Sequence, residues 1–598
     1  MIPSTASPAT HQTPARGAAS ARATWMLLLA VFAAVYIGSL FSPALLDDAD
    51  ATHAEAAREM AAAGDYVTLH VNGIRYLEKA PLMYWLVAGS FRVFGVSAVA
   101  ARLPVALSVL LLALLAWKWS RRAFGDRAAE YAALFVLTST GVFLFTRILI
   151  PDVLLALLIA AALYFFMTAL EERSAWRWYA GYAACALAVL SKGLVALVFI
   201  GGTAFGYLLW TSDWRRWREF RLLSGAALLV AIAAPWHLLA GVRNPGFFWF
   251  YFVNEHFLRF LGKRYPRDYN KLPALAYWGL HLAWLFPWSM FAAALFRRER
   301  GGPHDFAWRT RLMCWLLTAL VLVFFSLSTN QEYYTLPAYL PLLILIADAV
   351  ARAEQEPARR KLLVGSTAVI ALIGAAAAIA LTAGLWQSRH LPFVPDIGAA
   401  LVERGVGNYT LSMSHFFDLT GGAFAALRLP AALAALALLI APVASLLLRF
   451  KHRPRAATWA LAGGMAVLLV AAHLALARFE PYLSSRPLAQ AVQPLIRPDD
   501  RLVIYGDFSY GSSLTFYLQR PAWLVNGRTT SLEYGSRFPD APPVFWDDAQ
   551  LAREWSGGTR LFLFVSRERR EDADRLALGP RFLIAESSGK RVYSNRER

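Results

Sequence analysis

The chain has 598 residues, of which 58% are hydrophobic and only 17% are charged, and its mean hydropathy is +0.43. Apolar runs of about eighteen or more residues recur over most of its length, which indicates membrane-spanning helices and excludes an ordinary soluble protein. The net charge of +19 could indicate nucleic-acid binding, but the arginines lie in short clusters between apolar runs. That distribution is typical of cytoplasmic loops, so we expect no nucleic-acid partner. The two cysteines, Cys185 and Cys314, lie inside apolar runs, which disfavours a disulfide or a thiolate zinc site.

The N-terminal part of the chain predicts a tail and an anchor. Residues 1–23 are rich in Ala, Ser, Thr and Pro, and we expect a disordered cytoplasmic tail. The apolar run 24–46 is too long and too acidic at its exit for a cleaved signal peptide, so it is predicted to be a retained helix. It delivers the segment Asp47-Asp48-Ala49-Asp50 to the far side of the membrane. In the outer loop 47–80, apolar residues at helical spacing predict one or two short helices on the membrane surface.

Further apolar runs give about thirteen membrane helices in all. Predicted spans include 129–146, 178–190, 193–210, 222–240, 311–327, 363–385 and 457–476, and others end near Trp119, Glu171, Arg297, Arg352 and Arg449. A long aromatic loop, 241–272, is expected outside. Basic clusters at 121–127, 215–221, 297–311, 352–361 and 449–455 all fall on one side, and acidic or mixed clusters at 47–50, 152, 255 and 332 fall on the other. This pattern predicts a cytoplasmic N-terminus and a C-terminus outside.

Residues 479–598 differ in character from the membrane domain, 24–478. Short apolar runs such as Leu502–Tyr505 and Leu561–Val565 alternate with polar helical patterns and predict a small soluble α/β domain. No GxGxxG, Walker loop, HExxH or CxxC motif occurs, which disfavours nucleotide-driven pumps. No internal repeat is visible either, which disfavours transporters built from paired halves.

Carboxylates mixed with Lys and Arg on the outer side suit a site for phosphate esters, in which cations hold the phosphate and carboxylates orient the acceptor. The alternative is that these side chains snorkel from helix ends to water. Lys192, in a turn between two helices at membrane depth, needs an anion or an aspartate as partner. Glu78 and His256 could share a divalent metal, but two ligands from distant segments are weak evidence, and a hydrogen-bonded histidine is the favoured interpretation. The aromatic residues 247–252 fit membrane-interface anchors or the floor of a sugar site.

Several ordered motifs between residues 45 and 340 carry a resemblance. They are Ala54-Glu55-x-x-Arg58-Glu59-Met60, Gly64-Asp65, Gly73-Ile-Arg-Tyr76-Leu-Glu78-Lys79-x-Pro81-x-x-Tyr84-Trp85, Asp152 after a proline, Ser191-Lys192-Gly193, Glu255-His256-x-x-Arg259-Phe260 and Tyr334-x-Leu-Pro337. The chain resembles the lipid A aminoarabinose transferases, the ArnT-like family of undecaprenyl-phosphate-sugar glycosyltransferases (glycosyltransferase family 83), which is related to the protein O-mannosyltransferases. The aspartate run carries one residue more than in relatives, and the lysine that relatives often have before Tyr334 is absent.

The resemblance implies a mainly α, polytopic membrane protein of GT-C type with a periplasmic α/β domain in the bacterial inner membrane. It implies transfer of 4-amino-4-deoxy-L-arabinose from undecaprenyl phosphate to a lipid A phosphate, and hence polymyxin resistance. The implied catalytic residues are Asp48 or Asp50, together with Asp152. Donor phosphate and lipid would contact Lys79, Lys192, Arg259, Arg58 and Arg147, and the sugar and acceptor cavity would include Tyr76, Glu78, His256, Tyr334 and Asp47.

We expect no required cofactor, with a divalent cation at Glu78 and His256 left open. The expected partners are the lipid-linked sugar, lipid A and membrane lipids, bound by a monomer. Other readings stay open. The enzyme could move a different lipid-linked sugar, such as galactosamine or mannose, to lipid or protein. The chain could instead be a lipid or solute transporter, although its ionisable residues crowd one face rather than line a pore, or a non-catalytic assembly protein.

Overall fold

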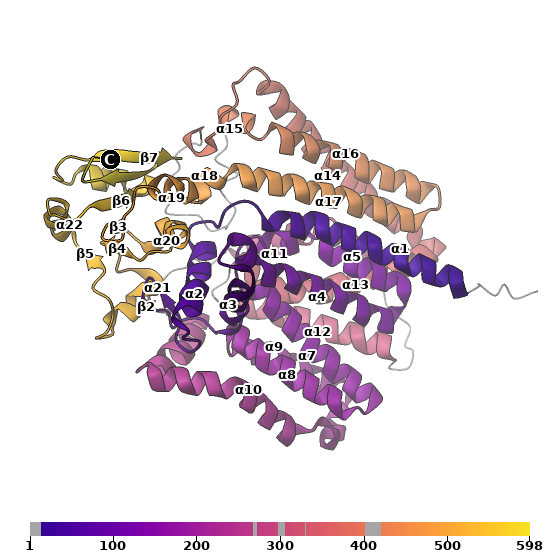
Figure 1. Cartoon of the computed structure of the whole chain (residues 1–598). Coiled ribbons are helices and arrows are strands. Elements are labelled where there is room, and N and C mark those ends of the chain that lie inside the picture. The colour runs from indigo at the N-terminus through magenta and orange to yellow at the C-terminus, as the bar shows by residue number, and fades with distance from the viewer. Residues whose placement is uncertain (1–13, 267–271, 297–304, 329–330, 401–419, 598) are drawn as a thin grey trace, which may run out of the picture.

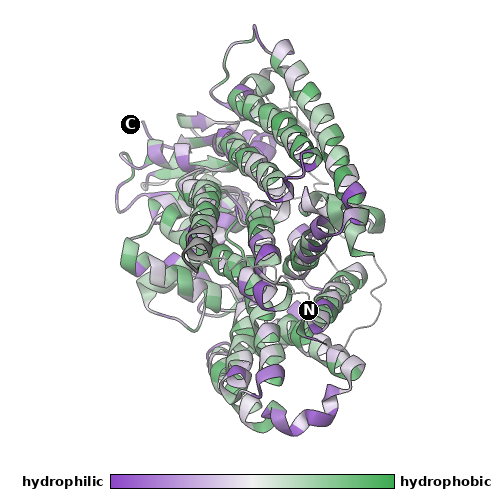
Figure 2. Ribbon diagram, turned by 90° about the vertical axis from the view of Figure 1, so that its right-hand side faces the viewer, coloured by the Kyte–Doolittle hydropathy of each residue, from purple (hydrophilic) through white to green (hydrophobic). Residues whose placement is uncertain are grey.

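The computed structural model describes residues 14–266, 272–296, 305–328, 331–400 and 420–597. It contains a bundle of long helices and a C-terminal domain built around a sheet, which lie side by side (Figure 1). Figure 2 shows hydrophobic residues along the bundle helices and hydrophilic ones in the C-terminal domain and at helix ends. The start of the predicted tail and the basic residues 297–304 lie outside the described residues.

The bundle consists of helices that follow the apolar runs. In chain order they are α1 (Pro14–Phe32), α2 (Ala49–Ala63), α3 (Leu82–Phe94), α4 (Ala98–Phe124), α5 (Asp126–Thr138), α6 (Thr140–Phe145), α7 (Asp152–Glu172), α8 (Ala175–Lys192), α9 (Val195–Thr211), α10 (Leu222–Arg243), α11 (Ala274–Trp284), α12 (Phe306–Leu327), α13 (Tyr339–Gln355), α14 (Arg360–Gln387), α15 (Gly421–Ala425), α16 (Arg428–Phe450) and α17 (Pro454–Arg478). Within the described ranges, nine helical segments are long and apolar enough to cross a membrane. The polytopic membrane fold is therefore confirmed, and the count of about thirteen spans stays a prediction.

Three of the predicted helices have different limits in the structure. The first begins at Pro14, so residues 14–23 are helical rather than part of a disordered tail, and it ends at Leu40 after a π-helical and a 3₁₀ turn. Pro43 follows, and its ring cannot continue a helix. The predicted span 129–146 is interrupted at Ser139, between α5 and α6. The span before residue 297 is divided at Pro287 into α11 and a 3₁₀ helix.

The outer loop 47–80 forms α2 and a small hairpin, β1 (His70–Val71) and β2 (Ile74–Arg75). The predicted short helix in this loop is confirmed as α2, and its place at the membrane surface stays a prediction. α2 packs against both α3 and α20 (Ser512–Leu518) of the C-terminal domain. Ala51, Ala54, Ala56 and Ala57 are all fully buried, because small side chains on several faces of a helix allow close packing in more than one direction.

The aromatic segment 241–272 is more ordered than the predicted loop. Residues Trp249–Leu258 form a π-helix, η4, in which Phe250 and Tyr251 are buried and Trp249 is exposed. Phe250 stacks on Tyr534 of the C-terminal domain, with ring centroids 3.8 Å apart. The segment therefore joins the two parts of the molecule while leaving Phe248 and Trp249 at the surface, as membrane-interface anchors require.

The C-terminal domain has one six-stranded sheet in the order β5-β4-β3-β6-β8-β7. Its strands are β3 (Arg501–Tyr505), β4 (Ala522–Val525), β5 (Phe545–Trp546), β6 (Leu561–Val565), β7 (Phe582–Ser587) and β8 (Lys590–Ser594). The first four are parallel and in register, with Val503 opposite Trp523 and Leu563, and β8 and β7 continue antiparallel. Every residue of β6 is buried, as expected for a strand covered on both faces. The predicted α/β domain and its two apolar strands are thus confirmed.

The helices of this domain and its contacts place it over the outer loop. Besides α20 they are α18 (Glu480–Leu483), α19 (Arg486–Val492), α21 (Thr530–Glu533), α22 (Asp548–Trp555) and α23 (Arg570–Asp574). Asn72 exchanges two hydrogen bonds of 2.7 and 2.8 Å with the backbone of Ala522. The Leu45 amide donates to the Tyr517 hydroxyl at 2.8 Å. Buried polar groups from both parts are therefore satisfied only when the domain sits on the bundle.

Candidate active site

Asp50 is a structural residue in a buried ion pair. Its side chain is 1% exposed and lies 2.9 Å from the guanidinium of Arg102 on α4. The backbone amides of Leu46 and Leu149 also donate to its carboxylate, at 3.0 and 2.9 Å. These donors hold the carboxylate in one position, so it joins the first outer loop to α4 and to the loop before α7.

Asp47 holds the C-terminal domain rather than lining a cavity. One carboxylate oxygen accepts from the amide and the hydroxyl of Ser513, at 2.9 and 2.7 Å. The other accepts from the Ser485 hydroxyl at 2.7 Å and from Lys590 Nζ at 2.9 Å. All four donors come from the C-terminal domain, which places Asp47 at an interface.

Asp48 is the exposed member of the three aspartates, and it forms no ion pair within the described part of the chain. Its side chain is accessible, yet it lies deep among surrounding segments. Burial, together with the negative charges of Asp507 and Asp47, raises the pKa of Asp48 to about 6, while Lys79 opposes the shift. An accessible carboxyl group that titrates close to neutral pH has the properties of a reactive residue.

A buried row of alternating charges follows from Lys79. Its Nζ lies 2.9 Å from Glu78, and Arg264 contacts the other oxygen of Glu78 at 2.5 Å. Arg264 also pairs with Glu255 at 2.7 Å, and Glu255 pairs with Arg259 at 2.7 Å. Three cations thus face two carboxylates, which leaves an excess positive charge able to attract an anion.

Both ends of the Glu78–Lys79 pair stay charged. Burial opposes ionisation of Glu78, but Lys79, Arg264 and Arg259 outweigh it and hold the pKa of Glu78 well below its usual range. Burial would likewise lower the pKa of Lys79, but the Glu78 carboxylate raises it above its ordinary value. The cation at Lys79 is therefore permanent at physiological pH.

Lys192 and Asp152 form a second charged pair beside the first. Lys192 Nζ lies 2.5 Å from Asp152 and 4.4 Å from the ring centroid of Tyr334. The Tyr334 hydroxyl accepts a hydrogen bond from Arg259 at 3.0 Å, so Tyr334 connects the Lys192–Asp152 pair to the row of charges that contains Arg259. The prediction that Lys192 needs an anionic partner is confirmed. The other oxygen of Asp152 is buried without a hydrogen-bond partner in the described structure.

His256 supports the turn that carries Lys192. Its Nδ1 lies 2.6 Å from the carbonyl oxygen of Tyr251, and its Nε2 accepts from the amide of Leu194 at 3.0 Å. Both ring nitrogens of His256 are bonded to the backbone, so His256 is a hydrogen-bonded histidine rather than a metal ligand. This geometry does not fit a metal shared with Glu78. No group of three or more His, Cys, Asp or Glu in the described ranges has the arrangement of a metal site.

Two predicted phosphate-binding arginines lie outside this cluster. Arg58 forms a bidentate pair with Glu55 one turn away on α2, at 2.6 and 2.7 Å. Arg147 donates to Ser39 Oγ and to the Phe143 carbonyl, and stands 5.4 Å over the Tyr36 ring. Of the predicted site residues, the structure brings together Glu78, Lys79, Asp152, Lys192, Arg259 and Tyr334. The ring centroid of Tyr76 lies 5.9 Å from Lys79 Nζ.

Sequence reasoning undervalued or missed several neighbours. Arg264 is not among the site residues that the resemblance implies, yet it bridges Glu78 and Glu255. His53 on α2 is buried, and its ring centroid lies 5.7 Å from that of Tyr84. Burial and the positive charge of Lys79 lower the pKa of His53 to about 3, so its side chain is neutral. Asp507, whose negative charge raises the pKa of Asp48, comes from the C-terminal domain, and no motif in the sequence indicates its role.

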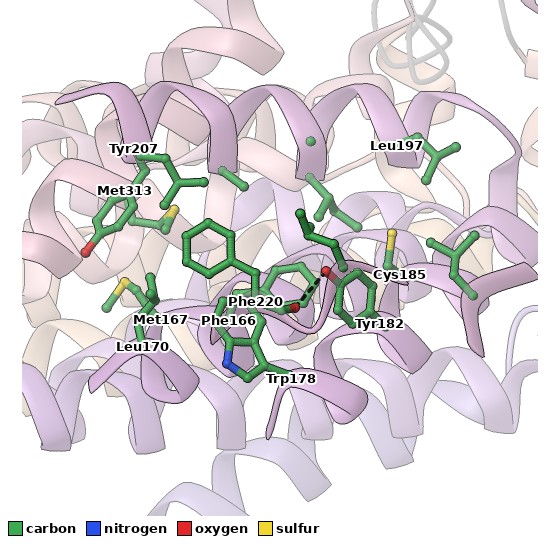
Figure 3. A pocket seen from close by; sticks show the side chains of 16 residues that line it. Phe166, Met167, Leu170, Trp178, Tyr182, Cys185, Leu197, Tyr207, Phe220 and Met313 are labelled. Carbon is green, nitrogen blue, oxygen red and sulfur yellow. Dashed lines mark hydrogen bonds between the residues drawn. The ribbon is translucent and has the colours of Figure 1, made fainter. Parts of the chain in front are cut away.

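An apolar cavity of about 230 Å³ lies in the bundle below this cluster, among α7, α8, α9, α10 and α12. Figure 3 shows Phe166, Trp178 and Tyr182 around it, with the Tyr182 hydroxyl donating to the carbonyl of Phe220. Gly201 on α9 is exposed and also lines the cavity, so the cavity reaches the surface of the bundle that would face lipid. Its lining suits an alkyl or prenyl chain.

Comparison with known proteins adds sequence and fold relatives. A family model described as dolichyl-phosphate-mannose-protein mannosyltransferase matches residues 78–238. An undecaprenyl phosphate-α-4-amino-4-deoxy-L-arabinose arabinosyl transferase 2 of Pseudomonas fluorescens is 31% identical over 59% of this chain and 60% of its own length. The corresponding transferase of Edwardsiella ictaluri is 26% identical over 87% of this chain and 88% of its own. In the first of these matches the chain thus spans about 60% of the relative.

The crystal structure of ArnT from Cupriavidus metallidurans bound to undecaprenyl phosphate superimposes with a TM-score of 0.79 and 25% identity, covering 96% of this chain and 98% of that one. The fold and the charged site define the chain as a polytopic membrane protein with the GT-C fold of lipid-dependent glycosyltransferases. Within this class it resembles the undecaprenyl phosphate–aminoarabinose transferases, and the resemblance carried by the sequence motifs is confirmed.

Proposed function

We propose that the protein is a membrane glycosyltransferase that moves 4-amino-4-deoxy-L-arabinose from undecaprenyl phosphate to a phosphate of lipid A, and thereby confers resistance to polymyxin. One observation carries the proposal. The accessible carboxylate of Asp48 interacts electrostatically with Lys79, which lies at one end of the charged row that also contains Arg264 and Arg259. The names of the relatives support the choice of sugar and carrier.

The reaction is an inverting displacement at the anomeric carbon. An oxygen of the acceptor phosphate forms the new bond to that carbon while the bond to the donor phosphate breaks, and undecaprenyl phosphate leaves with the electron pair. The acceptor is already anionic near neutral pH, so it needs orientation more than a strong base. Lys79, Lys192 and Arg259 stabilise the charge on the leaving phosphate, and each contact contributes on the order of 2–4 kcal/mol in the transition state.

The remaining groups orient the two substrates. Asp48 aligns the acceptor or holds the ammonium group of the sugar, for which an ionised carboxylate is required. Asp152 keeps Lys192 in place, and Tyr76 and Tyr334 border the cavity. The prenyl chain of the donor runs down the bundle towards the apolar cavity. That cavity begins at Cys185, about 10 Å along α8 from Lys192.

The proposal extends to location: the protein would lie in the bacterial inner membrane as a monomer, with its N-terminus in the cytoplasm and its C-terminal domain in the periplasm. The side on which the basic clusters fall supports this orientation. The site then faces the leaflet in which both lipid substrates would present their phosphates to water.

The matching mannosyltransferase family model favours a second candidate, the transfer of another lipid-linked sugar such as mannose to a lipid or protein acceptor. The same site would hold the donor phosphate in both cases. The two candidates differ only in the sugar and the acceptor, which mass spectrometry of the product distinguishes.

The test uses the purified full-length chain with lipid-linked aminoarabinose and lipid A in detergent, and detects the product by mass spectrometry. The wild type should add the aminoarabinose mass, whereas a transporter would form no new glycosidic bond. Asp48→Asn should fold normally and lose roughly 30- to 1,000-fold in rate. Asp50→Asn is the matched control, since it should chiefly lower the melting temperature by weakening the buried pair with Arg102. An Asp48→Asn protein with wild-type activity would sink the assignment.

A further inference from the structure

Asp48 has a backbone conformation that residues with a side chain rarely adopt. Its φ is 69° and its ψ is −129°, a combination favoured by glycine because a Cβ atom meets the neighbouring backbone. Such a conformation persists only when surrounding contacts enforce it, and it tends to occur at functional sites. The contacts that enforce it here identify the part of the molecule that sets the position of Asp48.

Both backbone polar groups of Asp48 are bonded to the C-terminal domain. Its amide donates to the carbonyl oxygen of Ser509 at 2.9 Å. Its own carbonyl oxygen accepts from the hydroxyl of Ser512 at 3.3 Å, in addition to the helical bond from Thr52. Ser509 and Ser512 belong to the segment that leads into α20, which packs against α2.

The preceding residue is fixed by the same domain. Lys590 Nζ and the hydroxyls of Ser513 and Ser485 all donate to the Asp47 carboxylate, and the Asp47 amide donates to the Leu483 carbonyl at 2.7 Å. The side chains of Lys590 and Asp47 are only 10% and 12% exposed. An ion pair this well buried and supported by three further donors is far less screened than one at the surface.

We propose that the C-terminal domain acts as a clamp in which Lys590 and Ser513 hold Asp47 and so keep Asp48 in its strained, outward-facing conformation. Lys590 and Ser513 are positioning residues, because they act through Asp47 and need not touch the substrate. This extends the proposed function and rests on it, since it assigns to the C-terminal domain a role in the reaction of the membrane domain.

The test compares Lys590→Met with Arg591→Met. The control residue is the next one on β8, and its ion pair with Glu586 lies entirely inside the C-terminal domain. Lys590→Met should lower kcat about tenfold and leave the KM for the lipid-linked donor unchanged, while Arg591→Met should retain wild-type kinetics. Lys590→Arg should recover most of the rate, because a cation then remains opposite Asp47. Ser513→Ala, a smaller change, should lower kcat in the same direction.

A second measurement does not depend on catalysis. Hydrogen–deuterium exchange of the backbone amide of Asp48 should be slow in the wild type and at least tenfold faster in Lys590→Met, but not in Arg591→Met. Wild-type kcat and wild-type exchange in both Lys590→Met and Ser513→Ala would overturn the clamp. A wild-type protein that transfers no sugar but shows the expected exchange pattern would contradict the proposed function alone.

Discussion

The carboxylate of Asp48 differs from those of Asp47 and Asp50 because, in the described structure, no cation is in contact with it. Asp50 and Asp47 are neutralised by Arg102 and Lys590 and are surrounded by further donors. Asp48 instead experiences the negative charges of Asp507 and Asp47, and the positive charge of Lys79, which forms no salt bridge with it, offsets them only in part. The pKa of this carboxyl group, about 6, therefore lies closer to neutral pH than that of an ordinary aspartate.

We predict that transfer slows as the pH falls through about 6, the value to which burial and the neighbouring carboxylates raise the pKa of Asp48. The ionised form is the active one, so activity is lost on the acid side. The corresponding stability effect has the opposite sign. Because the folded pKa lies above the unfolded one, the folded state binds the proton more tightly, and this stabilisation is complete at low pH and is lost as the pH rises through about 6. The profile of kcat/KM against pH measures the first effect.

The control must separate the ionisation of Asp48 from that of the substrate, because the second pKa of a phosphate monoester also lies near 6. Asp507→Asn removes one negative neighbour and should move the acid limb to lower pH, whereas a limb that belongs to the substrate would stay in place. His53 and His256 do not account for such a limb, since burial lowers the pKa of both. A profile that is the same in wild type and Asp507→Asn would refute the assignment.

The sequence could identify the reacting loop but could not choose among its carboxylates. Asp48, Lys79, Asp152, Lys192 and Arg259 were all predicted as site residues, because charge at a membrane boundary is costly unless it serves a purpose. What separates Asp48 from Asp50 is the position of Arg102 on a different helix, and the groups that hold Asp48 come from Ser509 and Ser512 of the C-terminal domain. Contacts over several hundred positions leave no local pattern in the sequence.

At the scale of elements, helix ends rather than helix interiors carry the charged site. Lys192 is the last residue of α8 and Asp152 the first of α7, so both are presented at the same boundary. Apolar runs predict such helices well because a membrane helix needs a long stretch of apolar residues. The break at Ser139 and the π-helix at 249–258 were not predictable, since packing of distant segments such as Phe250 on Tyr534 stabilises them.

The turn after α8 gives a prediction about Gly193, which has φ +80° and packs against His256. A Cβ atom there would lie 2.2 Å from His256 Nε2, so Gly193→Ala should displace His256 and with it the Lys192 turn. We expect lower kcat/KM and a lower melting temperature in detergent. Gly125→Ala is the matched control, because Gly125 also ends a helix with φ +86° but has no atom within 4 Å of the added Cβ. Equal behaviour of the two variants would contradict this reading of the turn.

The apolar cavity between α8 and α9 leads to a prediction about the donor lipid. A Cβ at Gly201 would meet no atom within 4 Å, so Gly201→Leu should place a side chain in the cavity without distorting α9. We expect a raised KM for a long-chain polyprenyl donor and an unchanged KM for a short-chain analogue. Gly365→Leu on α14, also in open space and away from the cavity, should alter neither value. If Gly201→Leu and Gly365→Leu had the same KM for the long-chain donor, the cavity would be excluded as the binding site of the prenyl chain.

At the scale of the whole molecule, the basic clusters and the C-terminal domain lie at opposite ends of the helices. The exposed residues of the 3₁₀ helix η3 (Asp213–Phe220), such as Arg215, belong to one of the predicted cytoplasmic clusters. The loops that meet the C-terminal domain lie at the ends of helices whose other ends carry these clusters. Retention of Lys and Arg in the cytoplasm would then place the sheet domain and Asp48 on the outer side of the membrane.

This orientation predicts the outcome of single-cysteine labelling. Cys185 and Cys314 are both buried, so they can be replaced by alanine to remove background with little exposed surface changed. In intact spheroplasts a membrane-impermeant maleimide should label Ser556→Cys, which is exposed in the C-terminal domain, and should not label Arg215→Cys. Permeabilising the membrane should make Arg215→Cys reactive, which shows that its thiol is competent. Labelling of Arg215→Cys in intact spheroplasts would invert the topology and place the site on the cytoplasmic side.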